Sequence, residues 1–368
     1  MRGSKELRGD VLDRGLCIGC GACVSLCPYF RSHNGKTAML FPCAMTEGRC
    51  FAYCPKTEVD LDLLSDFIFG SPYSADPLGN YRDVRISRAG AGLRTNACQA
   101  GGTVSAVMAC ALENRTIDAA VLTDRDGLLP VPRIVTDTVG VMGCASSKYA
   151  AAPTLSAYNQ AVNEGYQKIG VVATPCQVMA LAQMRCNPMR VEGFADPAAL
   201  VVGLFCTWSI DYRKFISFLA GRVDIGAIRK IDIPPPPSEV MEIYTGSGKI
   251  DLPLQEIREL VPGSCGYCFD MTSEFADISV GVLEGNPSMN TLIIRTARGE
   301  KLVAEAVRDG FLEVFDMPAE NLEHLRAAAG SKKMRAIRKA ESEGRINTGG
   351  GRALLRLSAA SVRSIVMK

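Results

Sequence analysis

The sequence has little histidine and tryptophan: its 368 residues include two His and one Trp. Sites built mainly from imidazole ligands are therefore not expected. No apolar run approaches the roughly 18 residues that a membrane-spanning helix needs, and the first ten residues lack the apolar core of a signal peptide. We therefore expect a cytoplasmic protein without a membrane span.

Charge is nearly balanced overall but not along the chain. The formal net charge is +2, with 47% hydrophobic and 22% charged residues, which excludes wholesale disorder. Residues 330–368 hold ten Lys or Arg against two Glu. We interpret this segment as a solvated, helical, basic tail; the alternative is a docking surface for an acidic partner subunit or an anionic cofactor. No nucleic-acid motif or interleaved aromatic residue accompanies the charge, so nucleic acid is not an expected partner.

Cysteine is abundant, with 15 residues in the chain and seven of them in the first sixty. A disulfide framework is not expected in a reducing compartment, so metal ligation is the leading interpretation. A segment this short with so many ligands is usually held together by its inorganic core.

The first four cysteines have the spacing of a bacterial ferredoxin. They are Cys17, Cys20, Cys23 and Cys27, and Pro28 follows the last one. Gly19 and Gly21 would let backbone amides turn toward the sulfurs. The motif therefore predicts an iron–sulfur site.

The second half of this head is irregular. Cys50 and Cys54-Pro55 repeat the end of the motif, and Cys43 precedes them. In a standard cluster pair, the first site would take Cys17, Cys20, Cys23 and Cys54. The second would take Cys27, Cys43 and Cys50, which is one thiolate short of four. A [3Fe–4S] cluster, Glu47 as a ligand, a cysteine from elsewhere, or an empty site are the alternatives.

From about residue 85 the pattern is that of an α/β domain. Apolar strands are predicted at 117–124, 168–175 and 200–206, each followed or preceded by a helical segment, which favours a largely parallel sheet. A hairpin turned at Gly246–Gly248 and an α+β stretch over 250–315 follow. The predicted fold is thus a mixed α+β and α/β chain with a ferredoxin-like head. Its predicted segments are the head (1–60), a linker (61–84), the larger α/β domain (85–317) and the helical tail (318–368).

Four later cysteines lie at positions where a sheet could bring them together. Cys176 and Cys206 follow predicted strands, and Cys265 and Cys268 form a CxxC pair. Carboxyl ends of parallel strands meet at one sheet edge, where α/β proteins build sites. Each signal alone is weak, because a single cysteine is often a small core residue and a CxxC pair can be redox-active or bind zinc.

A glycine turn before a helix is the other chemical signal. Gln99-Ala-Gly101-Gly102-Thr103 would let a backbone approach a phosphate at a helix N-terminus. Ser147, Lys148 and Tyr149 could add hydroxyls and a positive charge. An ordinary glycine turn and an ordinary helix cap are the alternatives, and the pattern is not the dinucleotide fingerprint.

Taken in order, these residues resemble the family of beta subunits of coenzyme F420 hydrogenase and dehydrogenase. The resemblance spans about residues 15–315. It rests on CIGCGAC, QAGGTVSAVMACALENRTIDAAV, GVVATPCQVMAL, VGLFC, CGYCFDMTSEFADISVG and IIRTARGE. It implies a flavoprotein in which Gln99, Gly101, Gly102, Thr103, Ser147, Lys148, Tyr149 and Thr174 lie against FAD. It also implies that Cys176, Cys206, Cys265 and Cys268 hold a [4Fe–4S] cluster near the flavin, giving two to three clusters in all.

The expected function is that of an oxidoreductase component of a larger complex. FAD would exchange a hydride with F420 or NAD(P)H, and the clusters would carry single electrons to or from a partner. Formate dehydrogenase, hydrogenase or a heterodisulfide-reductase-like complex are the expected partners. The alternatives are a ferredoxin-dependent reductase of an organic substrate and an electron-transfer adaptor without flavin. No catalytic side-chain acid or base is expected.

Overall fold

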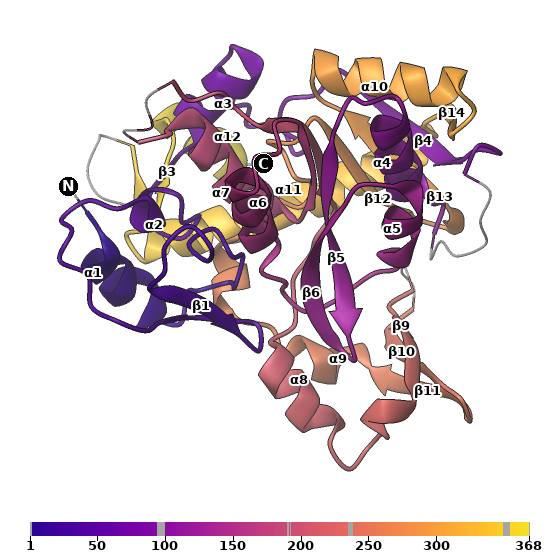
Figure 1. Ribbon diagram of the computed structural model, residues 1–368, viewed down its shortest axis with the longest axis horizontal. Coiled ribbons are helices and arrows are strands. Elements are labelled where there is room, and N and C mark those ends of the chain that lie inside the picture. Colours follow the sequence, from indigo (N-terminus) through magenta and orange to yellow (C-terminus); the bar gives the residue numbers. More distant parts are fainter. Residues whose placement is uncertain are drawn as a thin grey trace.

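A large sheet forms the centre of the protein (Figure 1). It has eight strands in the order β14-β4-β13-β12-β8-β7-β5-β6. The computed structural model describes residues 2–93, 100–189, 191, 193–234, 238–348 and 354–367. In chain order the strands of this sheet are β4 (Asp83–Ala89), β5 (Ala119–Asp126), β6 (Leu129–Val135), β7 (Ile169–Ala173), β8 (Ala198–Leu204), β12 (Ile278–Leu283), β13 (Asn286–Ile294) and β14 (Leu312–Asp316).

The sheet is parallel only in its middle. The pairings β5–β7, β7–β8 and β8–β12 are parallel, whereas β6, β13, β4 and β14 pair antiparallel. The prediction of a largely parallel sheet is therefore wrong for the two flanks. The reason is local, because short turns at Gly127 and Gly285, both with positive φ, join β5 to β6 and β12 to β13. Such short turns can connect only antiparallel neighbours.

Helices cover both faces of the parallel strands. α4 (Thr103–Glu113) and α10 (Ala297–Arg308) pack together on one face, and α6 (Thr154–Asn163) and α7 (Pro175–Cys186) lie on the other. Alternate strand residues follow this division: in β7, Ile169 and Val171 pack with α6 and α7, whereas Val172 packs with α4 and α10. All five residues of β7 are buried, as in strands covered on both faces.

The cysteine-rich head packs against α6 and α7. Asn159 of α6 is buried, and its Nδ2 donates to the carbonyls of Ala22 (3.1 Å) and Val24 (2.8 Å). A Cβ at Gly21 would lie 2.5 Å from the carbonyl oxygen of Pro153, so this glycine permits the close contact. The head consists of α1 (Ser4–Leu7), the π-helical turn η1 (Arg8–Leu12), the hairpin β1 (Phe30–His33) and β2 (Lys36–Met39), and α2 (Arg49–Ala52).

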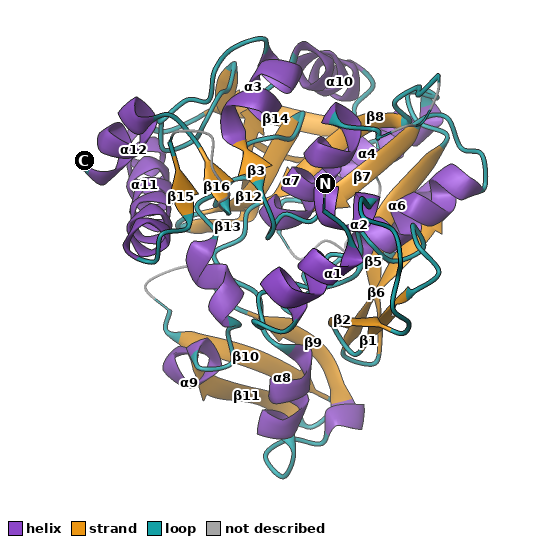
Figure 2. Cartoon of the chain, turned by 90° about the vertical axis from the view of Figure 1, so that its left-hand side faces the viewer, coloured by secondary structure: helices purple, strands orange, loops and turns teal. Residues whose placement is uncertain are grey.

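The tail is part of the packed body. β16 (Leu355–Arg356) lies between β15 (Ile346–Asn347) and β3 (Val59–Asp60) in a small parallel sheet (Figure 2). α3 (Leu61–Phe69), α11 (Ala319–Ser342) and α12 (Ala359–Val366) complete this region.

Helix α11 confirms the predicted helix but not its expected solvation. Lys332 and Lys333 are 6% and 1% exposed, respectively. The expectation of a solvated tail is therefore wrong for these two lysines, which contacts distant in sequence bury, whereas Arg335, Arg338 and Lys339 of the same helix are exposed.

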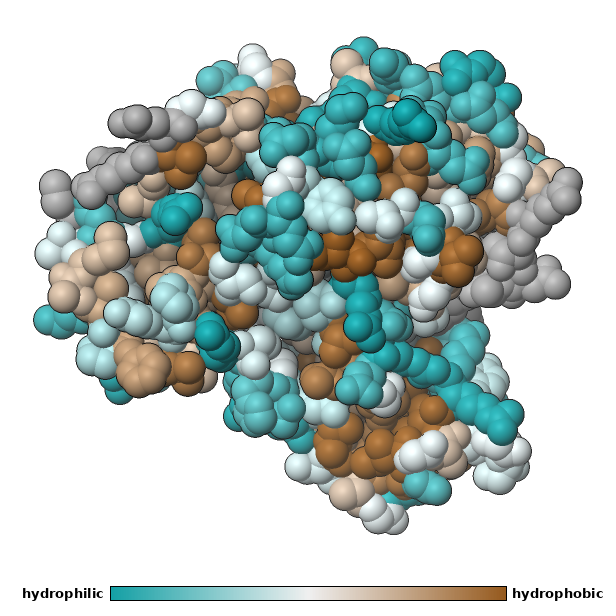
Figure 3. Space-filling view, viewed as in Figure 1, coloured by the Kyte–Doolittle hydropathy of each residue, from teal (hydrophilic) through white to brown (hydrophobic). Residues whose placement is uncertain are grey.

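A smaller lobe projects from the sheet and has its own apolar core. It contains α8 (Tyr212–Leu219), η2 (Ile225–Ala227), the sheet of β9 (Ile228–Asp232), β10 (Val240–Thr245) and β11 (Gly248–Pro253), and α9 (Leu254–Arg258). The predicted hairpin is confirmed as β10–β11. Figure 3 shows apolar side chains on this lobe, and the partly buried ones include Phe218, Val223 and Ile225. No helix within the described ranges is long and apolar enough to cross a bilayer.

Candidate functional site

A cavity of about 490 Å³ lies beyond the carboxyl ends of β7 and β8. Thr174 and Cys176 line it where β7 passes into α7, and Phe205 and Cys206 line it after β8. The predicted sheet edge is therefore the location of the cavity, as expected for an α/β arrangement. The other walls come from α4, from the segment between α5 (Thr138–Gly143) and α6, from the turn η3 (Gly263–Tyr267) and from α11.

The four later cysteines all line this cavity. Cys176 is the second residue of α7, Cys206 follows β8, and Cys265 and Cys268 lie in and directly after η3. Burial, together with the neighbouring Cys268 and Cys265, raises the pKa of Cys176 to about 11. Burial also raises the pKa of Cys206, and Cys176, Cys268 and Cys265 add to the rise. The structure therefore brings thiols from three distant segments into one electrostatic group.

In the head, the thiols form two neighbouring groups. Burial raises the pKa of Cys20 well above its usual value, and Cys54, Cys23 and Cys17 add to the rise. Burial raises the pKa of Cys50 to about 11, with further contributions from Cys27 and Cys43. These groups parallel the two sets of cysteines named from the spacing, and Cys50 also raises the pKa of Cys54, so the groups are in electrostatic contact.

Backbone donors also approach the head sulfurs as predicted. Gly19 has a φ of +66°, and its N–H donates to Cys17 Sγ at 3.4 Å. Cys50 contributes to the raised pKa of Cys23, whose largest cause is burial, so the two head groups are adjacent.

The described residues do not form a compact site for a single metal ion, because no group of three or more His, Cys, Asp or Glu side chains among them is arranged to hold one. Four thiolates around one zinc ion would stand about 3.8 Å apart, from a Zn–S bond of about 2.3 Å. In an iron–sulfur cube each thiolate binds a different iron atom, so the sulfurs stand further apart. Cysteine-only donor sets such as these are the ones that iron–sulfur clusters use.

The residues predicted to contact FAD are mostly gathered at the same cavity. Those that line it are Gly102, Thr103, Ser147, Lys148, Tyr149 and Thr174. Gln99 lies outside the described residues. Gly101 is not a lining residue: a Cβ there would lie 2.7 Å from Asn290 Oδ1, so this glycine is needed for close packing on β13.

Several of these side chains already have partners in the protein. The hydroxyl of Thr103 pairs with Ser87 at 2.8 Å, and its N–H donates to Asn290 Oδ1 at 3.2 Å. Thr174 is the N-cap of α7, and its N–H donates to Gln177 Oε1 at 2.9 Å. These side chains are therefore mainly engaged within the protein, and the residues contribute to the cavity chiefly through their main-chain atoms and the shape of the wall.

Lys148 and Tyr149 join neighbouring segments at the cavity wall. Lys148 Nζ donates to the carbonyls of Cys144 (2.6 Å) and Ser146 (3.0 Å), and burial lowers the pKa of this lysine. The Tyr149 hydroxyl donates to Asp232 Oδ1 at 3.1 Å and accepts from the N–H of Ile233 at 2.9 Å. Tyr149 thus ties the cavity wall to the smaller lobe.

Two buried lysines at the cavity were not anticipated from the sequence. Lys332 Nζ donates to the carbonyls of Cys206 (2.6 Å) and Asp270 (2.9 Å). Burial lowers the pKa of Lys332, but Cys268, Cys206, Asp270 and Cys265 together outweigh it, and the pKa is raised. Lys56 also lines the cavity, from the head. The basic composition of the tail was the only sequence signal for Lys332, and it gave no position.

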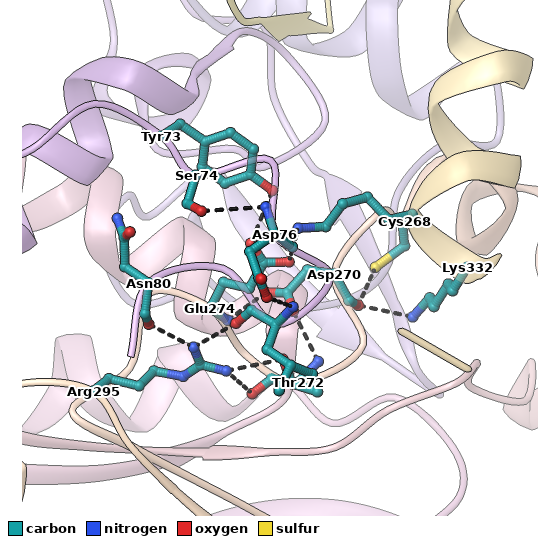
Figure 4. Close-up of polar contacts among 12 residues, drawn as sticks. Tyr73, Ser74, Asp76, Asn80, Cys268, Asp270, Thr272, Glu274, Arg295 and Lys332 are labelled. Atoms are coloured by element: carbon teal, nitrogen blue, oxygen red, sulfur yellow. Dashed lines mark hydrogen bonds and ion pairs between the residues drawn. The ribbon is translucent and has the colours of Figure 1, made fainter. Parts of the chain in front are cut away.

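A buried polar network supports the segment that follows Cys268 (Figure 4). The side chain of Asp270 accepts from the N–H groups of Thr272 (2.9 Å) and Glu274 (2.8 Å). The Arg295 guanidinium donates to Thr272 Oγ1 (2.9 Å) and the Thr272 carbonyl (3.1 Å). Burial raises the pKa of Glu274 to about 7, and Lys333 opposes the rise. These contacts fix the backbone that carries the last cysteine.

Family models match most of this architecture. The model for the N-terminal part of the coenzyme F420 hydrogenase/dehydrogenase beta subunit matches residues 89–159, and the model for its C terminus matches residues 166–320. A 4Fe-4S binding domain matches residues 10–29. The matched stretches contain the four cysteines of the cavity and the ferredoxin-like motif.

Individual relatives agree. The chain is 27% identical over 335 residues to a component of the F(420)H(2) dehydrogenase of Methanosarcina mazei, covering 85% of this chain and 88% of that protein. It is 27% identical over 310 residues to the coenzyme F420-dependent sulfite reductase of Methanocaldococcus jannaschii, covering 80% of this chain and 46% of that protein.

The fold agrees as well. A chain from the F420-reducing [NiFe] hydrogenase complex of Methanosarcina barkeri matches with a TM-score of 0.66 and 25% identity, covering 72% of this chain and 93% of that chain. The ferredoxin-like head and the mixed α/β body are those expected from the sequence. The chain is an oxidoreductase that belongs to the family of coenzyme F420 hydrogenase/dehydrogenase beta subunits.

Proposed function

We propose that this protein is an F420-linked subunit that holds FAD and a [4Fe–4S] cluster in the cavity and exchanges electrons with a partner through its head. The observation that carries this proposal is the shared cavity, which is lined both by four cysteines and by the candidate flavin-binding residues. When bound, FAD supplies the chemistry that couples a two-electron hydride carrier to one-electron clusters.

The residues around the cavity would bind and orient the flavin rather than react with it. Val104 and Ser105 join Thr103 at the wall, and the first N–H groups of α4 have no partner within the helix. Such amides favour a phosphate group. The ammonium of Lys148 is held by main-chain carbonyls at a fixed position on the wall. Apolar side chains such as Leu122 line the same space and would exclude water.

The head would hold up to two further clusters. Cys17, Cys20, Cys23 and Cys54 would bind a [4Fe–4S] cluster. Cys27, Cys43 and Cys50 would bind the second, as a [3Fe–4S] cluster or with a fourth ligand such as Glu47. Electron paramagnetic resonance of the oxidised protein separates these cases, because an oxidised [3Fe–4S] cluster is paramagnetic and an oxidised [4Fe–4S] cluster of the ferredoxin type is not.

The relatives support one choice of carrier and one kind of partner. Their names refer to F420, which favours F420 over NAD(P)H as the two-electron carrier. A catalytic metalloenzyme subunit, as in hydrogenase, formate dehydrogenase or sulfite reductase systems, would exchange electrons with the head. The cytoplasmic location and the division at residues 60, 84 and 317 belong to the same proposal.

The proposal is tested by anaerobic isolation followed by reduction. We expect bound FAD and a reduced flavin spectrum when F420H2 is added, with slower or no reduction by NADH and NADPH under the same conditions. The Lys148→Met variant should retain iron but hold less flavin. A protein that holds iron and no flavin would overturn the proposal in favour of an adaptor, and reduction by NADH alone would overturn the assignment of the carrier.

A further inference from the structure

Lys56 occupies the boundary between the head and the larger domain. It follows Cys54 by two residues and is 6% exposed. Its Nζ donates to the carbonyl oxygen of Ser264 at 3.1 Å, one residue before Cys265. One side chain of the head thus reaches the turn that carries the CxxC pair.

Lys56 also lines both cysteine-lined cavities. It borders the large cavity with Cys176, Cys206, Cys265 and Cys268. It borders a second, small cavity in the head with Cys17, Cys20, Cys23, Cys50 and Cys54. Among the residues that line either cavity, Ile18 is the other one common to both.

The charge of Lys56 acts on thiols of both sites. Burial raises the pKa of Cys54 to about 12, and the backbone N–H and the ammonium of Lys56 oppose this rise. For Cys176 and Cys265, burial again raises the pKa, and the Lys56 ammonium again opposes it. Lys56 therefore lies close enough to thiols of both sites for its positive charge to act on each of them.

No carboxylate neutralises this cation within the described part of the chain. The one acceptor found for its Nζ is the Ser264 carbonyl. Two other buried lysines differ from Lys56. Lys333 has a carboxylate partner, Glu274, at 3.0 Å. Lys332 is influenced by thiols of the larger domain only, because those that raise its pKa all belong to that domain. A buried cation without a counter-ion is costly unless negative charge is supplied nearby. Clusters with four thiolates carry net negative charge in both neighbouring sites.

We propose that Lys56 is a positioning residue shared by two clusters and that it raises the reduction potentials of both. One cluster would be held by Cys17, Cys20, Cys23 and Cys54, and the other by Cys176, Cys206, Cys265 and Cys268. The inference rests on the proposed function, because it requires that both sites hold clusters. An added electron makes either cluster more negative, so a fixed cation between them stabilises the reduced form of each. A single side chain would thus shift the two potentials in the same direction.

The test is a redox titration of the anaerobically isolated full-length protein, followed by electron paramagnetic resonance. Cys54→Ser and Cys268→Ser variants assign the signal of each site. The Lys56→Gln variant keeps a hydrogen-bond donor but removes the charge. We expect it to lower the reduction equilibrium constant of both clusters at least tenfold, about 59 mV for a one-electron couple.

Two matched variants complete the test. Lys56→Arg should restore the reduction equilibrium constants of both clusters to within threefold of wild type. Lys332→Gln should lower the reduction potential of the cluster in the larger domain only. The inference is overturned if Lys56→Gln shifts one cluster or neither. It is also overturned if Lys56→Gln loses iron that Lys56→Arg retains, because the residue would then govern assembly. Wild-type protein without clusters would instead refute the proposed function, before Lys56 is tested.

Discussion

Arg295→Met would remove a guanidinium that is 2% exposed and makes five hydrogen bonds. Three of its acceptors are main-chain carbonyls, those of Leu78, Asn80 and Thr272, at 2.7–3.1 Å. Each buried acceptor left without a donor costs about 1–3 kcal/mol, and regained solvation of the lost charge offsets part of the sum. We expect a net loss of about 3–5 kcal/mol, as for other broken buried charge networks. That is a large share of the 5–15 kcal/mol that typically stabilises a domain.

The loss should be visible at the cluster as well as in the fold. Thr272 lies four residues after Cys268, so a released loop would free this proposed cluster ligand. Urea denaturation of the anaerobic protein, followed by circular dichroism and by cluster absorbance, measures both effects. Arg308→Met is the control, because Arg308 is exposed and its ion pair with Asp309 lies in solvent, where such pairs contribute little to stability. If the Arg295 variant unfolds at the urea concentration of this control and retains its cluster absorbance, the reasoning is refuted.

Three further predictions concern the cavity and the head. Gly101→Ala should destabilise the protein by about 1–3 kcal/mol and lower its flavin content, because the new Cβ would lie 2.7 Å from Asn290 Oδ1. Gly143→Ala is the control: it has open space around it and should leave the urea denaturation curve unchanged. Glu274 has a pKa raised from 4.5 to about 7 in the folded protein, so its contribution to stability is present at low pH and is lost as the pH rises towards 7. The stability of wild type relative to Glu274→Gln should therefore fall as the pH rises from 4.5 to about 7, and a pH-independent difference would contradict this. Asn159→Ala should reduce cluster occupancy of the head, measured as iron per protein, far more than Asn163→Ala, since Asn159 makes two buried hydrogen bonds and Asn163 one exposed one.

The parts of the structure that could be predicted from the sequence are those with local causes. The spacing of Cys17, Cys20 and Cys23 and the positive φ of Gly19 are short-range properties, and the structure has both. The convergence of Cys176 and Cys206 could be inferred because both follow buried strands, and parallel strands end at one edge.

The remainder depends on contacts between distant segments. Lys56 and Ser264 are joined by a hydrogen bond across 208 positions, and no pattern near either residue indicates it. Lys332 is buried because α11 packs against the cavity, although its local sequence is that of an exposed basic helix. The reason for Gly101, a close approach to Asn290, likewise appears only when β13 is in place.

Iron content of the Cys206→Ser variant tests the central claim most directly. Cys206 is remote in sequence from the other cysteines of the cavity, whereas Cys110, 1% exposed in α4, serves as a buried cysteine of the same domain that does not line the cavity. We predict that anaerobically isolated Cys206→Ser lacks the iron of one [4Fe–4S] cluster and its resonance signal, and that Cys110→Ser matches wild type. Full iron content and unchanged spectra in Cys206→Ser would contradict the account.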